Sequence, residues 1–356
     1  MLRLMIVSLV VASPLAAAEP APPPRAAARP ATAVVESSLA TGNNQIRQFA
    51  FDGDADTYFA SEKNAGKDDH LTLIFDEPVK AKAVRVTTGR PKGGDALAAG
   101  VLEVSADGKA FTELATFAGG AAAGAPKAAV KAVRVRTTED LKHALVVREI
   151  AIDADPAVAV FRYPIEFEVD VTDAPEMREW AEKTARVCER QYPMICDQLP
   201  SDGFKPLTVI RMTLKSDYKG VAAAGGGRIT GSVKYFKDRP GDVGAMVHET
   251  VHCVQMYRGR GNPGWLVEGV ADYIRFFKYE GGNIGMRLTP ERAKFDASYR
   301  VSAAFLAYVT EQYDPQLVRK LNAAMRTGKY SPEVWKEATG KTVEDLGREW
   351  QKSLAK

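Results

Sequence analysis

The hydrophobic period of this chain changes once, at Asp155-Pro156, and that change most constrains the fold. Before it, apolar residues alternate in short, strand-length segments, and helical spacing is absent. Beyond it, apolar residues recur mostly at helical spacing. Because 356 residues exceed the usual size of one domain, we expect two domains with separate cores.

The N-terminal half has the alternation and turn spacing of an antiparallel β-sandwich. Its expected strands cover residues 71–75, 84–88, 102–105, 111–117, 130–136 and 146–152. Asp107-Gly108 predicts a tight turn, and the Gly/Ala run over residues 119–125 predicts a flexible loop. We therefore expect an all-β sandwich over residues 33–155.

The C-terminal half, residues 156–356, predicts a mostly helical α+β domain. A strand over residues 161–171 precedes a helix that begins near Thr172-Asp173 and runs to about Arg190, with Pro175 in its first turn. A further strand is expected near residues 207–213. Helices are expected near residues 242–257, 263–278, 297–312, 315–326 and 342–354.

The first 32 residues predict export. Arg3, an apolar stretch and Ala16-Ala17-Ala18 have the order of a signal peptide over residues 1–18. Residues 19–32 are rich in Pro and Ala and predict an extended linker. A secreted or periplasmic location follows. In that oxidising compartment, we expect Cys188 and Cys196 to pair across a helix end, which leaves Cys253 as a buried thiol.

Charge and hydropathy argue against nucleic acid binding and against a membrane-spanning segment. The net charge is +3 with both signs interleaved, and the absence of a Lys/Arg block argues against nucleic acid. Beyond the signal peptide, no apolar run approaches the roughly 20 residues of a membrane span.

Two of the four histidines, His248 and His252, lie in one HExxH frame. Apolar neighbours at helical spacing place both imidazoles one turn apart on a single helix face, where they can bind one Zn²⁺ ion. Glu249 lies beside them. Its carboxylate could take a proton from a metal-bound water and pass it to a leaving amine.

The next predicted helix offers the third metal ligand. Glu268 and Asp272 are four residues apart and share one face. We expect Glu268 to bind the metal and Asp272 to orient a ligand histidine through a hydrogen bond. The spacing leaves the reverse assignment open.

The segments HETVHCVQ and WLVEGVADYIR resemble the gluzincin arrangement, and most closely the basic secretory proteins of plants and their bacterial relatives. The similarity extends over about residues 160–355. It implies a zincin-like metallopeptidase that acts on peptide or protein substrates, and the choice of Glu268 as ligand rests on the gluzincin pattern. Tyr299 resembles a recurrent tyrosine that would stabilise an oxyanion. A core tyrosine is the alternative.

Residues 50–59, 102–108 and 147–150 resemble the discoidin, or coagulation-factor C-type, galactose-binding-like sandwiches. The resemblance implies a jelly-roll module that attaches to a glycan or a cell surface. It also implies a Ca²⁺ ion held by Asp54, Thr57 and Glu149, with a metal-free, hydrogen-bonded turn as the alternative.

Two functions from different classes fit these patterns. The first is a secreted zinc peptidase with Glu249 as general base, targeted by the sandwich. The second is a non-catalytic adhesive or carbohydrate-binding protein whose zinc site is structural. Glu249 distinguishes them, because a structural site needs no carboxylate beside the metal. The glycine-rich segment 225–232 could be an edge strand that pairs with a peptide, or a plain loop.

Overall fold

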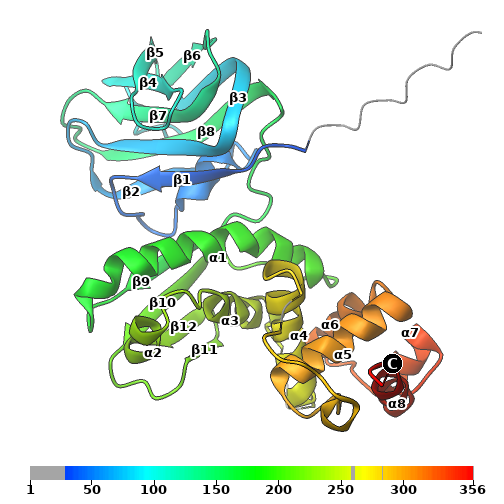
Figure 1. The fold of residues 1–356 in the computed structure, drawn as a ribbon. Coiled ribbons are helices and arrows are strands. Elements are labelled where there is room, and N and C mark those ends of the chain that lie inside the picture. The colour runs from blue at the N-terminus through cyan, green and yellow to red at the C-terminus, as the bar shows by residue number, and fades with distance from the viewer. Residues whose placement is uncertain (1–28, 258–260, 283, 356) are drawn as a thin grey trace, which may run out of the picture.

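The computed structural model describes residues 29–257, 261–282 and 284–355. The predicted signal peptide and most of the predicted linker lie outside the described residues. The described chain forms a β-sandwich and a mostly helical domain, each with its own hydrophobic core (Figure 1). Among the described residues, no helix combines the length and apolarity needed to cross a membrane.

The sandwich is an antiparallel assembly in the order β2-β8-β3-β7-β4-β5, and β1 and β6 also pair with β3. Its elements are β1 (Ala33–Ser37), η1 (Arg47–Phe51), β2 (Phe59–Asn64), β3 (His70–Thr88), β4 (Gly100–Ser105), β5 (Thr112–Thr116), β6 (Ala121–Gly124), β7 (Val130–Thr137) and β8 (Ala144–Asp155). The predicted all-β fold is confirmed.

Strand β3 joins the two layers of the sandwich. Its first part pairs with β1 and β7, and its second part pairs with β6 and β8. Between Ile74 and Val79 the register with β7 shifts, so one long strand replaces the two short ones that were predicted. The Gly/Ala run, predicted as a flexible loop, contains β6. Alanine has a weak strand preference, so the pairing with β3 decides its structure.

The second domain contains a four-stranded sheet in the order β11-β12-β10-β9. The strands are β9 (Glu166–Asp170), β10 (Val209–Lys215), β11 (Ala222–Gly225) and β12 (Arg228–Ser232). The edge strand β11 is antiparallel to β12, and the other pairs are parallel. Gly226 and Gly227 form the tight turn between β11 and β12 with φ of 58° and 75°. The glycine-rich segment is thus a turn and an inner strand, and the edge strand precedes it.

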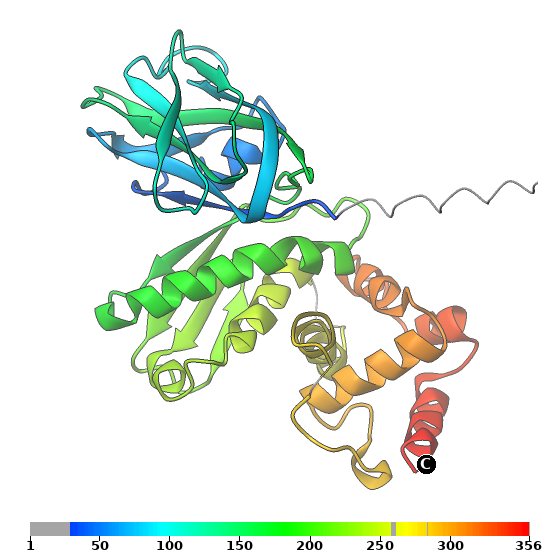
Figure 2. The same ribbon diagram turned by 45° about the horizontal axis from the view of Figure 1, so that its top comes forward.

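Helices make up most of the rest of this domain. They are η2 (Pro175–Met177), α1 (Arg178–Gln198), α2 (Val233–Asp238), α3 (Gly244–Gln255), α4 (Gly264–Tyr273), its π-helical continuation η3 (Ile274–Tyr279), η4 (Pro290–Arg292), α5 (Tyr299–Gln312), α6 (Leu317–Arg326), α7 (Glu333–Thr339) and α8 (Val343–Ser353). Figure 2 shows α1 running along the side of the domain that faces the sandwich.

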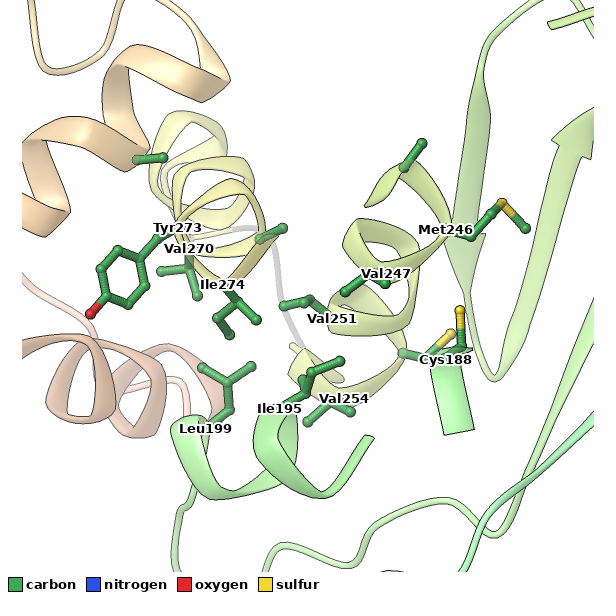
Figure 3. Packing of buried hydrophobic residues seen from close by; sticks show 14 of the residues in the cluster. Cys188, Ile195, Leu199, Met246, Val247, Val251, Val254, Val270, Tyr273 and Ile274 are labelled. Atoms are coloured by element: carbon green, nitrogen blue, oxygen red, sulfur yellow. The ribbon is translucent and has the colours of Figure 1, made fainter. Parts of the chain in front are cut away.

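Helix α3 lies between α1 and α4 (Figure 3). Val251 faces Val270 and Ile274, whereas Val254 lies beside Ile195 of α1. Each of these valines is fully buried, which stabilises the fold by about 1.5–3 kcal/mol per side chain. The HExxH helix is therefore held on two sides by packed apolar residues.

The predicted disulfide is wrong. Helix α1 continues through Pro193 to Gln198, so Cys188 and Cys196 lie on one helix. Eight residues of helix separate their Cα atoms by about 12 Å, beyond the roughly 7 Å that a disulfide can bridge. All three cysteines are free and buried, as was expected of Cys253, and burial raises the pKa of each thiol to about 12.

Charged and polar side chains join the two domains. Arg47 of the sandwich lies 3.2 Å from a Glu166 oxygen and 3.4 Å from a Glu189 oxygen. Gln48 accepts a hydrogen bond from the Ile165 amide at 2.9 Å. After the predicted boundary at Asp155, the chain returns to the sandwich, where Phe161 packs on a phenylalanine of η1. The chain therefore leaves the core of the sandwich after Phe161, later than the change in sequence pattern at Asp155-Pro156 indicates.

Candidate metal centre

Three side chains from α3 and α4 converge on one point. His248 and His252 are one turn apart on α3, and their Nε2 atoms are 3.1 Å apart. Glu268 of α4 places its Oε2 atom 3.2 Å from His248 Nε2 and 3.3 Å from His252 Nε2. In the described part of the chain, this is the one group of histidine, cysteine or carboxylate side chains close enough to hold an ion together.

The spacing of these atoms fits zinc. Ligand atoms about 2.05 Å from a tetrahedral ion lie about 3.3 Å from one another, and the three observed separations are 3.1 to 3.3 Å. Two imidazole nitrogens and one carboxylate oxygen are also a donor set that zinc prefers. They would occupy three positions of a zinc tetrahedron and would leave the fourth open to a water or a substrate atom.

Each histidine is oriented through its other ring nitrogen. The buried Asp272 carboxylate lies 2.7 Å from His248 Nδ1. Gln255 Oε1 lies 2.7 Å from His252 Nδ1, and its amide group donates to the Val267 carbonyl at 2.9 Å. The structure thus places Glu268 at the Nε2 atoms and Asp272 behind His248. Gln255 was missed, although its position three residues after His252 is a helical spacing that indicates such a contact.

The carboxylates govern protonation of this centre in the absence of metal. Burial of His248 disfavours its charged form, but the hydrogen bonds to Asp272 and Glu268 outweigh burial and raise its pKa to about 9. Burial opposes ionisation of Glu268 as well, yet the two histidines lower its pKa to about 2. A proton on His248 would therefore compete with a metal ion for the same nitrogen.

Glu249 and Tyr299 lie beside the two histidines but come from different helices, α3 and α5. Glu249 is buried, one of its carboxylate oxygens has no hydrogen-bond partner, and burial raises its pKa. Tyr299 begins α5, and its ring is stacked with that of His248, at 6.4 Å between centroids and 20° between planes. Its exposed fraction of 55% excludes the core-tyrosine alternative.

Two hollows meet at the metal centre, and both are lined by Ala222, His248, Glu249 and Tyr299. The first, called the β11 hollow, has a volume of about 530 Å³ and extends along residues 222–226. The second, called the Arg300 hollow, has a volume of about 690 Å³. It is lined further by Tyr235, Asp242, Arg275 and Arg300. Together they form a groove with the candidate metal-binding residues in its middle.

The predicted calcium residues meet at the turn before β2, where the Gly53 amide donates a hydrogen bond to the Glu149 carboxylate of β8. Thr57 Oγ1 donates to the Asp52 carboxylate at 2.9 Å, and Asp54 accepts the Asp56 amide at 2.9 Å within the same turn. Glu149 has a buried carboxylate oxygen without a partner. Burial and the nearby Asp52 raise the pKa of Glu149 to about 7. Asp52 was not predicted as a ligand, although it begins the same acidic turn, residues 52–57, which is called the Asp52 turn below.

Comparison with known families gives the class of the C-terminal domain. Residues 167–350 match a family model described as a peptidase of plants and bacteria, and the match spans more than half of the chain. The C-terminal domain is therefore a peptidase domain. The chain belongs to the BSP family of peptidases, as the segments around the two histidines had indicated. A search of curated proteins found no match.

Three solved structures that are similar to this chain contain carbohydrate-binding modules from Clostridium perfringens. One is CBM32-1 of a family 31 glycoside hydrolase, with 16% identity, 34% of this chain and 92% of that chain covered, and a TM-score of 0.30. Another is the family 32 module of NanJ in complex with galactose. It is 10% identical, the match covers 34% of this chain and 92% of that chain, and the TM-score is 0.29. A third structure contains the CBM32-1, CBM32-2 and M60 catalytic domains of ZmpB. It is 11% identical, the match covers 33% of this chain and 14% of that chain, and the TM-score is 0.30.

Proposed function

We propose that this chain is an exported zinc-dependent peptidase whose sandwich module attaches it to a glycan or a cell surface. The observation that carries the proposal is the triangle of His248, His252 and Glu268 atoms, which fits three positions of a zinc tetrahedron and opens onto a groove. The peptidase family of the C-terminal domain supports the reaction class.

The three ligands would hold the ion, and the ion would polarise both a water molecule and the scissile carbonyl. Glu249 then takes a proton from the water and delivers it to the leaving amine. Its unpaired oxygen is free to accept that proton, and its raised pKa makes it a stronger base than an ordinary glutamate. The exposed Tyr299 hydroxyl donates a hydrogen bond to the oxyanion.

The substrate lies along the groove in an extended conformation. Strand β11 is a sheet edge that borders the metal centre, so its free backbone groups can pair with a peptide. Such pairing binds the main chain of a peptide whatever its sequence. Selectivity then depends on how the peptide side chains fit the β11 hollow and the Arg300 hollow.

The alternative of an adhesive protein with a structural zinc site has less support. A structural site fills all four positions with protein ligands, whereas only three converge here within the described residues. An unpaired buried carboxylate is costly in a purely structural site, and a proton-transfer role accounts for Glu249.

The test compares wild type with Glu249→Gln. The variant should bind one zinc per chain, because all three ligands remain, and its hydrolysis of casein should fall by about 10² to 10⁴-fold. Glu311→Gln, an exposed change on α5, is the matched control and should retain full activity. Equal hydrolysis by wild type and Glu249→Gln, with zinc bound in both, would favour the adhesive alternative.

The sandwich is proposed to bind a glycan and to hold Ca²⁺ at the Asp52 turn. Glu149 offers an unpaired buried oxygen there, and carboxylate and carbonyl oxygens are the ligands that calcium prefers. A related module is solved with galactose, so galactose-bearing glycans are the first ligands to assay. Binding to an array of such glycans, with and without calcium, tests both parts.

A further inference from the structure

The Arg300 hollow contains one guanidinium without a carboxylate partner. Arg300 follows Tyr299 in the first turn of α5, and its Nη1 atom donates to the Ile284 carbonyl at 3.1 Å. Its guanidinium lies 5.0 Å from the centre of the Phe276 ring. These two contacts fix the group at the wall of the hollow, and no carboxylate of the described residues forms an ion pair with it.

The neighbouring Arg275 differs in this respect. It pairs with Asp242 and, at 2.9 Å, with Glu280, so its charge is neutralised inside the protein. Asp242 also accepts a hydrogen bond from Tyr235 at 2.6 Å. Asp242 thus has partners of its own, and Asp272 is held by His248 at 2.7 Å. Arg300 forms no ion pair with either carboxylate and is left to interact with a ligand.

The orientation of the edge strand predicts which part of a substrate reaches Arg300. Strand β11 begins at Ala222, which lines both hollows, and ends at Gly225, which lines only the β11 hollow. Antiparallel pairing is slightly more stable than parallel pairing. An antiparallel peptide runs from Gly225 towards Ala222, so the residues after its scissile bond enter the Arg300 hollow.

We propose that Arg300 selects substrates that carry a carboxylate on the C-terminal side of the scissile bond. The carboxylate can belong to a Glu or Asp side chain or to the C-terminus of the peptide, because a guanidinium binds either one through paired hydrogen bonds. The inference rests on the proposed peptidase function and gives its substrate class.

Phosphinic peptides test the inference without turnover. Their phosphinate replaces the scissile bond, binds the zinc and thereby fixes the register, and calorimetry gives Kd for the zinc-loaded wild-type protein. An amidated peptide with Glu at one of the three positions after the phosphinate should bind about tenfold tighter than its Gln counterpart. A second pair, all-alanine with a free or an amidated C-terminus, distinguishes the terminal carboxylate from the side chain as the source.

Variants assign the effect to Arg300. Arg300→Gln should remove the preference for Glu, Arg300→Lys should keep part of it, and Arg300→Glu should reverse it in favour of Lys peptides. Arg292→Gln, an exposed change outside both hollows, should leave it intact. Equal binding of Glu and Gln peptides to wild type, or a preference for Glu before the phosphinate, overturns the inference. The all-alanine amide reports the metal site independently, so its failure to bind would count against the proposed function instead.

Discussion

At the scale of single residues, the proposed metal centre depends on Asp272 in addition to its three ligands. The Asp272 carboxylate holds His248 with Nε2 directed at Glu268 and His252. Asp272→Asn should weaken zinc binding by about 10 to 100-fold, whereas Glu268→Ala should remove a ligand and reduce the metal content directly. Competition with a chelator measures both. Loss of metal in Asp272→Asn with retention in Glu268→Ala would exchange the two roles.

Protonation of the same histidine predicts a pH dependence. With a pKa of about 9 in the metal-free protein, His248 is mostly protonated at neutral pH, and zinc must displace that proton. The apparent zinc affinity should therefore rise about tenfold per pH unit as the pH increases from 7 towards 9. Chelator titrations at several pH values measure the slope. Asp272→Asn lowers the pKa of His248, so a slope that persists unchanged in this variant contradicts the assignment.

At the scale of elements, the Asp52 turn predicts a calcium-dependent stability. The pKa of Glu149 is about 7 in the folded protein and near 4.5 in the unfolded chain. A raised carboxyl pKa means that the folded state binds more protons, so stability falls as the pH rises from 5 to 8. Calcium should abolish this fall because it stabilises the ionised form. Thermal melts of wild type and Glu149→Gln, with and without calcium, check both statements, and the variant should show neither dependence.

Helix α1 carries a prediction that reverses the one made from its sequence. Denatured, unreduced protein should contain three reactive thiols, because Cys188 and Cys196 lie too far apart on one helix to pair. Thiol titration in denaturant counts them. A single reactive thiol would mean that α1 ends before Pro193 in solution.

The elements show how far local pattern reaches. Alternation identified most sandwich strands, and helical spacing placed His248 and His252 on one face, because these signals lie within single segments. Strand β6 was not predicted, because its alanines form a strand only through pairing with β3. The first helix was predicted to end near Arg190, yet α1 continues through Pro193 to Gln198 because tertiary packing outweighs the lost hydrogen bond. The contact of Arg47 with Glu189 joins residues 142 apart, which no local pattern predicts.

At the scale of the whole molecule, the two domains are joined by buried charge. Glu166 and Glu189 belong to the peptidase domain, but Arg47 of the sandwich lies against both. Arg186 also pairs with Glu189. The sandwich should fold alone because its core is separate, whereas an isolated peptidase domain would retain two buried carboxylates without their main cation.

Substitution of that cation tests the junction. Arg47→Met should lower the free energy of unfolding by about 3 kcal/mol at pH 8, because it leaves Glu189 with Arg186 alone. At pH 5 the loss should be smaller. Burial already raises the pKa of Glu189 to about 7, so the acid is protonated there and needs no cation. Urea unfolding at both pH values measures the effect, and Arg178→Met, from an exposed pair, is the control expected to change little. An equal loss at both pH values would contradict a charge-based junction.

The buried junction also limits where a tethered enzyme could cut. A module on a loose linker would let its catalytic partner sample many heights and directions above a surface. Here Arg47 and Gln48 contact the peptidase domain directly, and the connecting segment packs on the sandwich through Phe161, so the two domains are not joined by a loose linker. A surface-bound molecule would then reach only peptide segments at one distance from its attachment point. Selectivity among crowded surface proteins would arise from this geometry even if the groove itself accepted many sequences.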